Sequence, residues 1–155
     1  TALSIMSIFP NLQTNATART LLVGFSQTAQ SPEVRDHLMR GSEITKKHIK
    51  VMNTILEDSD LPASATAESE VTDSTIPPFS DKLMMQHTTV LIGAGMGNYG
   101  LALGASTRID VAVDYARLMG EIATYGEDGV QLMIKNRWLE QPPQAADRKE
   151  LALSR

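Results

Sequence analysis

The sequence predicts an all-α protein built as a four-helix bundle, and three observations support this prediction. Apolar residues recur at three- and four-residue steps along four long stretches of the chain. Residues 1–78 contain no convincing run of the alternating type that a β-strand would need. Eight Met against three Phe, three Tyr and one Trp indicate a core of aliphatic and thioether side chains, which suits packed helices. At 155 residues, the chain is long enough for one domain with a real core.

The first helix is expected over residues 1–30. Its apolar positions are Leu3, Met6, Phe9, Ala16, Leu21, Leu22 and Phe25. Pro10 conflicts with this pattern, because a proline inside a helix removes a hydrogen bond and costs roughly 3 kcal/mol. We expect either a kink at Pro10 or a helix that begins near Asn11.

The second helix is predicted from Pro32 to about Asp58. Ser31, Pro32 and Glu33 form a start signal, with an N-cap, a proline in the first position and an acid in the first turn. The apolar stripe consists of Val34, Leu38, Gly41, Ile44, His48, Val51 or Met52, and Ile55. Residues 59–78 then lose this period, and a connection of that length lets two consecutive helices of a bundle run parallel.

The third helix is predicted from a cap at Ser80 or Asp81 to about Gly104, and the fourth from about Arg108 to Leu139. The core stripe of the fourth helix is Val111, Tyr115, Leu118, Ile122, Tyr125, Gly129 and Leu132. We expect the bundle to occupy residues 1–143, and residues 144–155 to form a polar tail with at most a short helix.

Residues 88–104 (TTVLIGAGMGNYGLALG) allow a second interpretation. Residues 95–100 fit the pattern G-x-G-x-x-G after an apolar run, and Asp114 lies 19 residues after Gly95, as a dinucleotide-binding unit would require. However, a parallel sheet needs more strands than the sequence supplies, and the crossover helix would be of minimal length. We therefore predict one continuous helix and no dinucleotide site.

The glycines of this helix raise a packing question. Gly93, Gly97, Gly100 and Gly104 lie along one face, and each disfavours a helix by roughly 1 kcal/mol relative to alanine. Packing must offset that cost. We expect Gly93 and Gly97 to face the bundle interior, where another backbone or a bulky side chain would occupy the space.

Charge and composition exclude several classes of protein. The net charge of −4 and a pI near 5.3 give no basic footprint for nucleic acid. There is no cysteine, and no apolar run is long enough to predict a membrane span. The first residues, Thr1 to Ser4, have no basic region and do not predict a signal peptide. The chain lacks a start Met, so we expect it to begin inside a longer gene product.

Several segments resemble one family of Bacillus and related spore-formers, the domain of unknown function 3231. They are residues 71–85 (VTDSTIPPFSDKLMM), 41–44 with 47–49, 98–100, 108–110, and 125–129 through 138–143. The resemblance covers nearly the whole chain and implies a ferritin-like bundle with a long crossover between its second and third helices. It also implies that this is the second of two tandem domains. Some members are labelled spore coat proteins, and Pro10 departs from the family pattern.

A ferritin-like fold raises the possibility of a di-metal site, which needs Glu-x-x-His on each of two helices. Glu43 is followed at that spacing by Lys46, and Glu121 by Thr124, so neither motif exists. We therefore expect no metal and no cofactor.

The candidate site is instead a buried polar cluster of His48, Tyr99 and Glu121, which the ferritin-like resemblance implies would lie where a metal sits in relatives of the wider fold. The alternative is that His48 is a core histidine satisfied by a neighbour. Asp114, Arg117, Glu121 and Asp128 are expected to form a solvated or interhelical salt-bridge face. His37 and His87 are expected at the surface.

These observations predict a non-enzymatic structural or interaction domain of a spore-former, cytoplasmic or spore-associated and self-assembling. We expect a homo-oligomer, with Met84 or Met85 at the contact because the start of the third helix has more apolar residues than one core needs. The alternative is a degenerate ferritin-like protein that binds a small ligand or a single metal in the bundle core.

Overall fold

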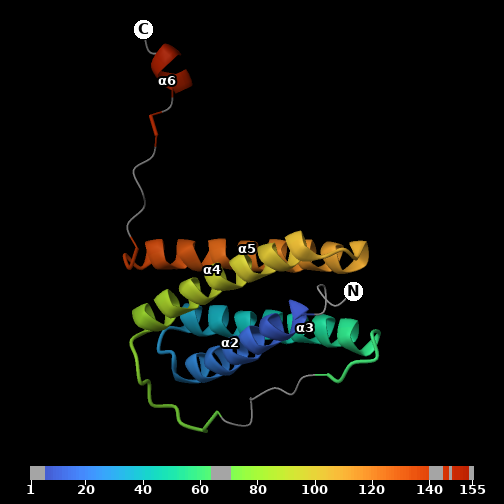
Figure 1. The fold of residues 1–155 in the computed structure, drawn as a ribbon. Coiled ribbons are helices and arrows are strands. Elements are labelled where there is room, and N and C mark those ends of the chain that lie inside the picture. The colour runs from blue at the N-terminus through green and yellow to red at the C-terminus, as the bar shows by residue number, and fades with distance from the viewer. Residues whose placement is uncertain (1–5, 64–70, 140–144, 147, 154–155) are drawn as a thin grey trace.

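Four long helices pack side by side as a bundle (Figure 1). The structure is a computed structural model that describes residues 6–63, 71–139, 145–146 and 148–153. The helices are α2 (Ile8–Thr28), α3 (Pro32–Glu57), α4 (Asp81–Ala105) and α5 (Ile109–Lys135), followed by the short α6 (Arg148–Leu153). The described residues contain no β-strand, so the all-α prediction is confirmed.

The first long helix begins at Ile8, with Ser7 at its N-cap. Pro10 therefore lies in the first helical turn, where a backbone N–H has no partner inside the helix and its loss costs nothing. The later start near Asn11 is therefore wrong by three residues. The alternative of a kink stays a prediction, since Met6 is helical and a turn at Ser7 interrupts the helix just before Pro10. Residues 1–5 of the predicted first helix lie outside the described residues.

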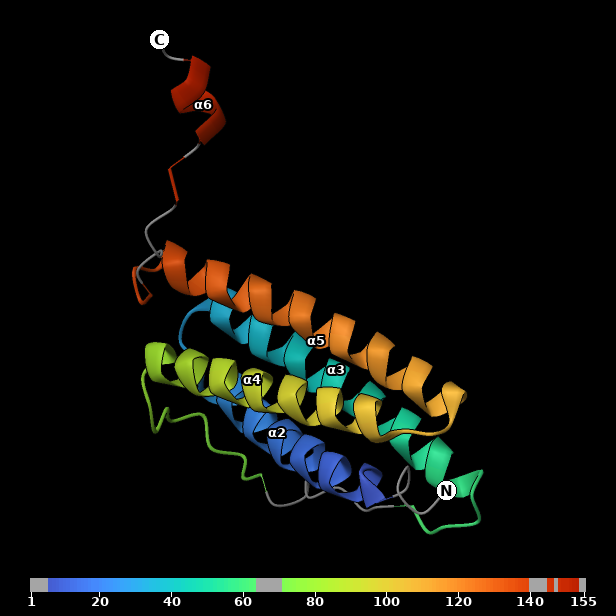
Figure 2. The same cartoon turned by 45° about the horizontal axis from the view of Figure 1, so that its top comes forward.

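The starts of α3 and α4 meet at one end of the bundle. The carboxylate of Asp81 accepts hydrogen bonds from the backbone N–H groups of Gln30 and Ser31, at 3.0 and 2.7 Å. Because α3 starts at Pro32 and α4 at Asp81, the two helices run parallel, as the long crossover predicts. The bundle is thus two antiparallel pairs, α2 with α3 and α4 with α5 (Figure 2).

The second half of the crossover lies along α2. The side-chain amide of Gln27 donates to the carbonyl oxygens of Thr72 and Ser74, at 2.7 and 2.9 Å. A Cβ atom at Gly24 would contact Val71 at 3.8 Å. The described part of this segment is therefore tied to the bundle by specific contacts, while residues 64–70 lie outside the description.

The core consists of two clusters, one toward each end of the bundle. The first contains Ile8, Leu12, Ala16, Ile49, Met52, Ile55, Leu56, Tyr99, Ala102, Val111, Tyr115 and Leu118. The second contains Leu22, Phe25, Ala29, Val34, Leu38, Met84, Met85 and Met133. Polar side chains, among them Asn15, Thr45 and His48, are buried between the two clusters.

Helix α4 runs unbroken through the glycine-rich stretch, as predicted, but its orientation differs from expectation. Its buried residues are Met84, Met85, Thr88, Tyr99 and Ala102. Large side chains thus fill the core and turn the glycine face outward. The expected inward packing of Gly93 and Gly97 is wrong, because both are exposed and a Cβ atom there would meet nothing within 4 Å.

The same orientation corrects the predicted contact at the start of α4. Met84 and Met85 are both 0% exposed and belong to the second core cluster. Neither side chain can reach another molecule without opening the bundle, so their assignment to a self-association contact is wrong.

Helix α5 ends at Lys135 rather than at Leu139. Arg137 adopts a left-handed conformation, with φ of 58°, and the backbone N–H of Trp138 returns to the carbonyl of Met133 at 2.8 Å. This is a Schellman motif, which could not be predicted from the sequence because the left-handed position is not a glycine. Residues 140–144 of the predicted boundary between bundle and tail lie outside the described residues, and α6 falls within the predicted tail.

Candidate functional site

The structure brings together the three residues of the predicted polar cluster, each from a different helix. His48 of α3 is 0% exposed. Its Nδ1 atom lies 2.9 Å from the hydroxyl of Tyr99 on α4, and its Nε2 atom lies 3.1 Å from a carboxylate oxygen of Glu121 on α5. The histidine therefore links α5, which packs against α3, to α4, which lies across the bundle from α3.

Glu121 fixes the proton positions on His48. Desolvation alone would raise the pKa of this carboxyl, but hydrogen bonds from Lys47, at 2.8 Å, and from His48 outweigh it and lower the pKa. The carboxylate is therefore ionised and accepts a hydrogen bond from the Nε2–H group of His48. Burial lowers the pKa of His48, so its ring is neutral and Nδ1 carries a lone pair. Nδ1 accordingly accepts the hydroxyl proton of Tyr99.

Asn15 of α2 extends this chain of hydrogen bonds, and the sequence analysis did not predict that Asn15 takes part. Its Nδ2 atom donates to the Asn11 carbonyl at 2.7 Å and to the Tyr99 hydroxyl oxygen at 2.8 Å. All four long helices thus contribute to one hydrogen-bonded relay that runs from Asn15 through Tyr99 and His48 to Glu121. The available signal was a polar residue beside the apolar positions Leu12 and Ala16 of the first helix.

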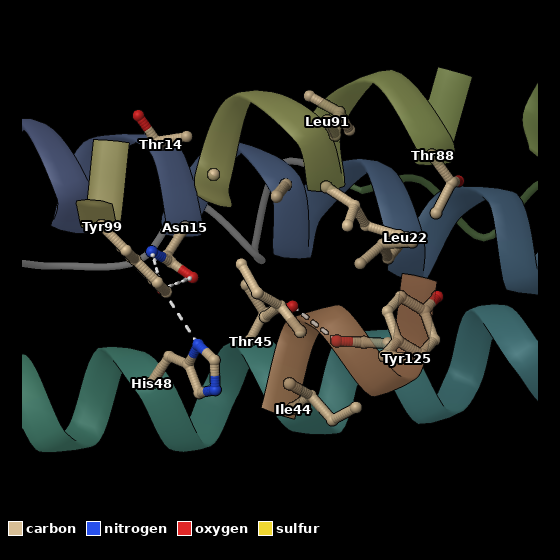
Figure 3. A pocket seen from close by; sticks show the side chains of 15 residues that line it. Thr14, Asn15, Leu22, Ile44, Thr45, His48, Thr88, Leu91, Tyr99 and Tyr125 are labelled. Atoms are coloured by element: carbon tan, nitrogen blue, oxygen red, sulfur yellow. Dashed lines mark hydrogen bonds between the residues drawn. The ribbon is translucent and has the colours of Figure 1, made fainter. Parts of the chain in front are cut away.

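A cavity of about 60 Å³ lies beside the relay. Figure 3 shows Asn15, Tyr99 and His48 together at one end of it, with Leu22, Thr88 and Tyr125 toward the other. Most of the remaining wall is apolar and comes from Ala18, Ile44, Leu91, Ile92 and Ile122. The cavity therefore has one polar end and an apolar body.

Charged residues of α5 form the salt-bridge face that the sequence predicts. Asp114 pairs with Arg117 within α5, at 2.9 Å. Glu121 and Asp128 pair across to Lys47 and Arg40 of α3. These pairs line the outer edge of the α3–α5 contact, so they orient Glu121 toward His48.

The two remaining histidines behave differently from each other. His87 is exposed, as predicted, but His37 is buried, with 7% of its surface exposed. Desolvation by burial, helped by the nearby Arg40, lowers the pKa of His37 to about 4. The prediction that His37 lies at the surface is therefore wrong. Its position near the start of α3 concealed the fact that it shares the buried face with Val34, Leu38 and Gly41.

Metal binding has no preformed ligand set within the described part of the chain. No three His, Asp or Glu side chains there are grouped closely enough to hold an ion. Both ring nitrogens of His48 are already engaged, by Tyr99 and Glu121. In the same described residues, no helix combines the length and apolar character needed to span a membrane.

Comparison with solved structures identifies the fold. A candidate spore coat protein from Bacillus halodurans superposes with a TM-score of 0.76 and 16% identity, covering 93% of this chain and 94% of that one. A two-domain protein from Anabaena variabilis, with DJ-1/ThiJ/PfpI-like and ferritin-like domains, superposes with a TM-score of 0.71 and 14% identity. That match covers 92% of this chain and 40% of the Anabaena protein. The bundle is therefore ferritin-like.

No curated protein matches the chain. A family model does match, over residues 1–151, and its description is "Protein of unknown function (DUF3231)". Because this match spans almost all of the 155 residues, the chain belongs to the DUF3231 family.

Proposed function

We propose that this chain is a non-enzymatic structural or interaction domain that associates with further copies of itself. The observation that carries the proposal is the outward face of α4, formed by Val90, Gly93, Gly97, Leu101 and Gly104 and called here the glycine stripe. Val90 is 69% exposed and Leu101 is 76% exposed. An exposed apolar face on a helix commonly marks a contact with another protein.

The energetics of the glycine stripe favour close approach by another helix. Each glycine in a helix costs roughly 1 kcal/mol relative to alanine. A Cβ atom at Gly93, Gly97 or Gly104 would meet nothing within 4 Å, so no contact inside the described bundle offsets this cost. A helix packed directly on the stripe would offset it, because the missing side chains let two backbones come close.

We propose a second copy of the chain as the partner that packs on the glycine stripe. A two-fold axis brings the same stripe of each copy together, which is the commonest arrangement in homo-oligomers. The non-enzymatic part of the proposal rests on the relay at His48. Asn15, Tyr99, His48 and Glu121 are hydrogen-bonded to one another, so none of these side chains is free to act as an acid or a nucleophile.

Light scattering over a range of protein concentrations tests self-association. We expect the wild-type mass to exceed that of one chain and Leu101→Lys to reduce it to the monomer, because a lysine on the stripe would have to lose its hydration. Ile76→Lys is the matched control, since Ile76 is 78% exposed but lies in the crossover. A monomeric wild type, or equal effects of both substitutions, would overturn the proposal.

We also propose that the domain is associated with the spore, on the basis of the Bacillus halodurans neighbour. The test is fractionation of purified spores from a sporulating Bacillus that expresses the chain. We expect the protein in the coat fraction, and we expect Leu101→Lys to lower its amount there. Recovery of the wild-type protein only from the mother-cell lysate would contradict this assignment.

A further inference from the structure

When the protons of the relay are counted, one buried acceptor, Oδ1 of Asn15, is left without a donor. The hydroxyl oxygen of Tyr99 lies 2.9 Å from Nδ1 of His48 and 3.0 Å from Oδ1 of Asn15, but it has only one proton to give. Glu121 holds the His48 proton on Nε2, so Nδ1 requires the hydroxyl proton. The Asn15 amide cannot be flipped to compensate, because its Nδ2 atom donates to the carbonyl of Asn11.

The other hydroxyl groups on the cavity wall also present acceptors. Thr14, Thr45 and Thr88 each donate to the carbonyl four residues earlier on their own helix. The hydroxyl of Tyr125 donates to the backbone carbonyl of His37 at 3.1 Å. Every hydroxyl proton on the wall is therefore committed elsewhere, and the polar atoms left for an occupant are oxygen lone pairs.

The remaining chemistry of the cavity excludes charged occupants. Its body is lined by aliphatic side chains, and none of its lining residues is Asp, Glu, Lys or Arg. Its one histidine, His48, already has both ring nitrogens engaged by Tyr99 and Glu121. Transfer of an ion into such a site without a partner costs far more than transfer of a hydroxyl that finds an acceptor. An occupant that fits is uncharged, is apolar over most of its surface, and supplies one hydrogen-bond donor.

The opening of the cavity and its volume limit the size of the occupant. Thr14 and Ala18 of α2, and Leu91 and Gly95 of α4, line the cavity and are only partly buried, so it reaches the surface between these helices. A dry cavity of about 150 Å³ holds benzene. The volume of about 60 Å³ therefore accommodates the polar end of a small molecule, with its tail in the opening.

We propose that this cavity binds a small uncharged alcohol, whose hydroxyl group donates to Oδ1 of Asn15 and whose aliphatic chain lies between α2 and α4. The assignment is independent of self-association, because the cavity is inside one bundle and the glycine stripe faces away from it. An alcohol matches both the polar end of the cavity and its apolar walls.

A titration with 1-butanol tests the proposal, with methyl propyl ether as a comparison of the same atomic composition that lacks a donor. The signals observed are the side-chain methyl resonances of Ile44, Ile92 and Ile122, which line the cavity. We expect saturable shifts with 1-butanol and binding at least tenfold weaker for the ether. No saturable shift, or equal binding of the two probes, would overturn the proposal.

Two variants localise the binding. Gly95→Leu places a side chain in the cavity, where a Cβ atom would already lie 3.7 Å from Ile122, and we expect it to abolish the shifts. Gly120→Leu is the matched control, since nothing lies within 4 Å of a Cβ atom there, and it should bind 1-butanol as the wild type does. Asn15→Leu should bind alcohol and ether equally. Unchanged 1-butanol binding by Gly95→Leu would refute the location.

Discussion

His37 and Tyr125 stack face to face across the contact between α3 and α5, with ring centroids 4.2 Å apart and planes inclined by 8°. Each ring lies over a glycine of the other helix. A Cβ atom at Gly41 would overlap the Tyr125 hydroxyl, and a Cβ atom at Gly129 would lie 2.9 Å from Nε2 of His37. These two reciprocal ring–glycine contacts fix how α3 and α5 approach each other.

Gly41→Ala should therefore lower the free energy of unfolding by roughly 1–3 kcal/mol, as overpacking of a core does. Urea denaturation provides the measurement. Gly120→Ala is the matched control, because its Cβ atom enters open space, and it should raise stability by up to about 1 kcal/mol. Adding Tyr125→Phe to Gly41→Ala should restore part of the loss. Equal effects of the two alanine substitutions would show that the ring does not require the glycine.

Burial of His37 should make the bundle less stable in acid. The pKa of His37 in the folded protein is about 4, and an unfolded histidine titrates near 6.5, so the unfolded chain binds more protons between these values. The contribution of His37 to the free energy of unfolding is therefore fully present above about pH 6.5. It declines as the pH falls toward 4, and about 2 kcal/mol is lost at pH 5. Arg40 favours the neutral ring and Asp128 opposes it.

Thermal unfolding of wild type and His37→Phe at pH 7 and pH 5 checks this prediction. Phenylalanine keeps an aromatic ring against Tyr125 but cannot titrate, so the variant should lose less stability on acidification. A smaller pH dependence remains in the variant, because burial also lowers the pKa of His48. Identical losses in the two proteins would rule out His37 as a source of the acid sensitivity.

The helices that could be placed best from sequence are those with two distinct faces. In α3 and α5, buried apolar positions alternate with charged ones, so the pattern gives both the helix and its orientation. Helix α4 is apolar almost all round its axis. Its existence could be predicted, but periodicity could not show that Met84 and Met85 are buried while Gly93 and Gly97 are exposed.

The candidate site was only partly predictable for a related reason. His48 stands out as a polar residue on the apolar stripe of α3, so its role in a cluster could be predicted. Helix α2 is different, since Asn11, Asn15 and Arg19 recur at four-residue steps and are themselves buried. Polar residues thus occupy the inner face of α2, and apolar periodicity alone could not identify Asn15 as a member of the relay.

The tautomer of His48 is directly measurable. Because Glu121 accepts from Nε2 and Tyr99 donates to Nδ1, nitrogen NMR at pH 7 should show a neutral ring protonated on Nε2. Tyr99→Phe should lower the free energy of unfolding by roughly 1–3 kcal/mol, since it leaves buried atoms of His48 and Asn15 without their partner. A ring protonated on Nδ1 at pH 7 would reverse the direction of the relay.

The ends of α3 and α5 make a last prediction about backbone strain. Asp60 and Arg137 have φ of 56° and 58°, a left-handed conformation that glycine adopts more readily than other residues. Hydrogen bonds hold each in place, from Leu61 N–H to the Leu56 carbonyl and from Trp138 N–H to the Met133 carbonyl, at 2.9 and 2.8 Å.

Asp60→Gly and Arg137→Gly should therefore each raise the free energy of unfolding, by about 0.5–1 kcal/mol, because the relief of strain exceeds the added freedom of the unfolded chain. Lys135→Gly, two residues earlier but inside α5, is the matched control and should lower stability by about 1 kcal/mol. Urea denaturation of the three variants would decide the matter. If Arg137→Gly destabilised the protein as much as Lys135→Gly, the left-handed ending of α5 would have no role in terminating the helix.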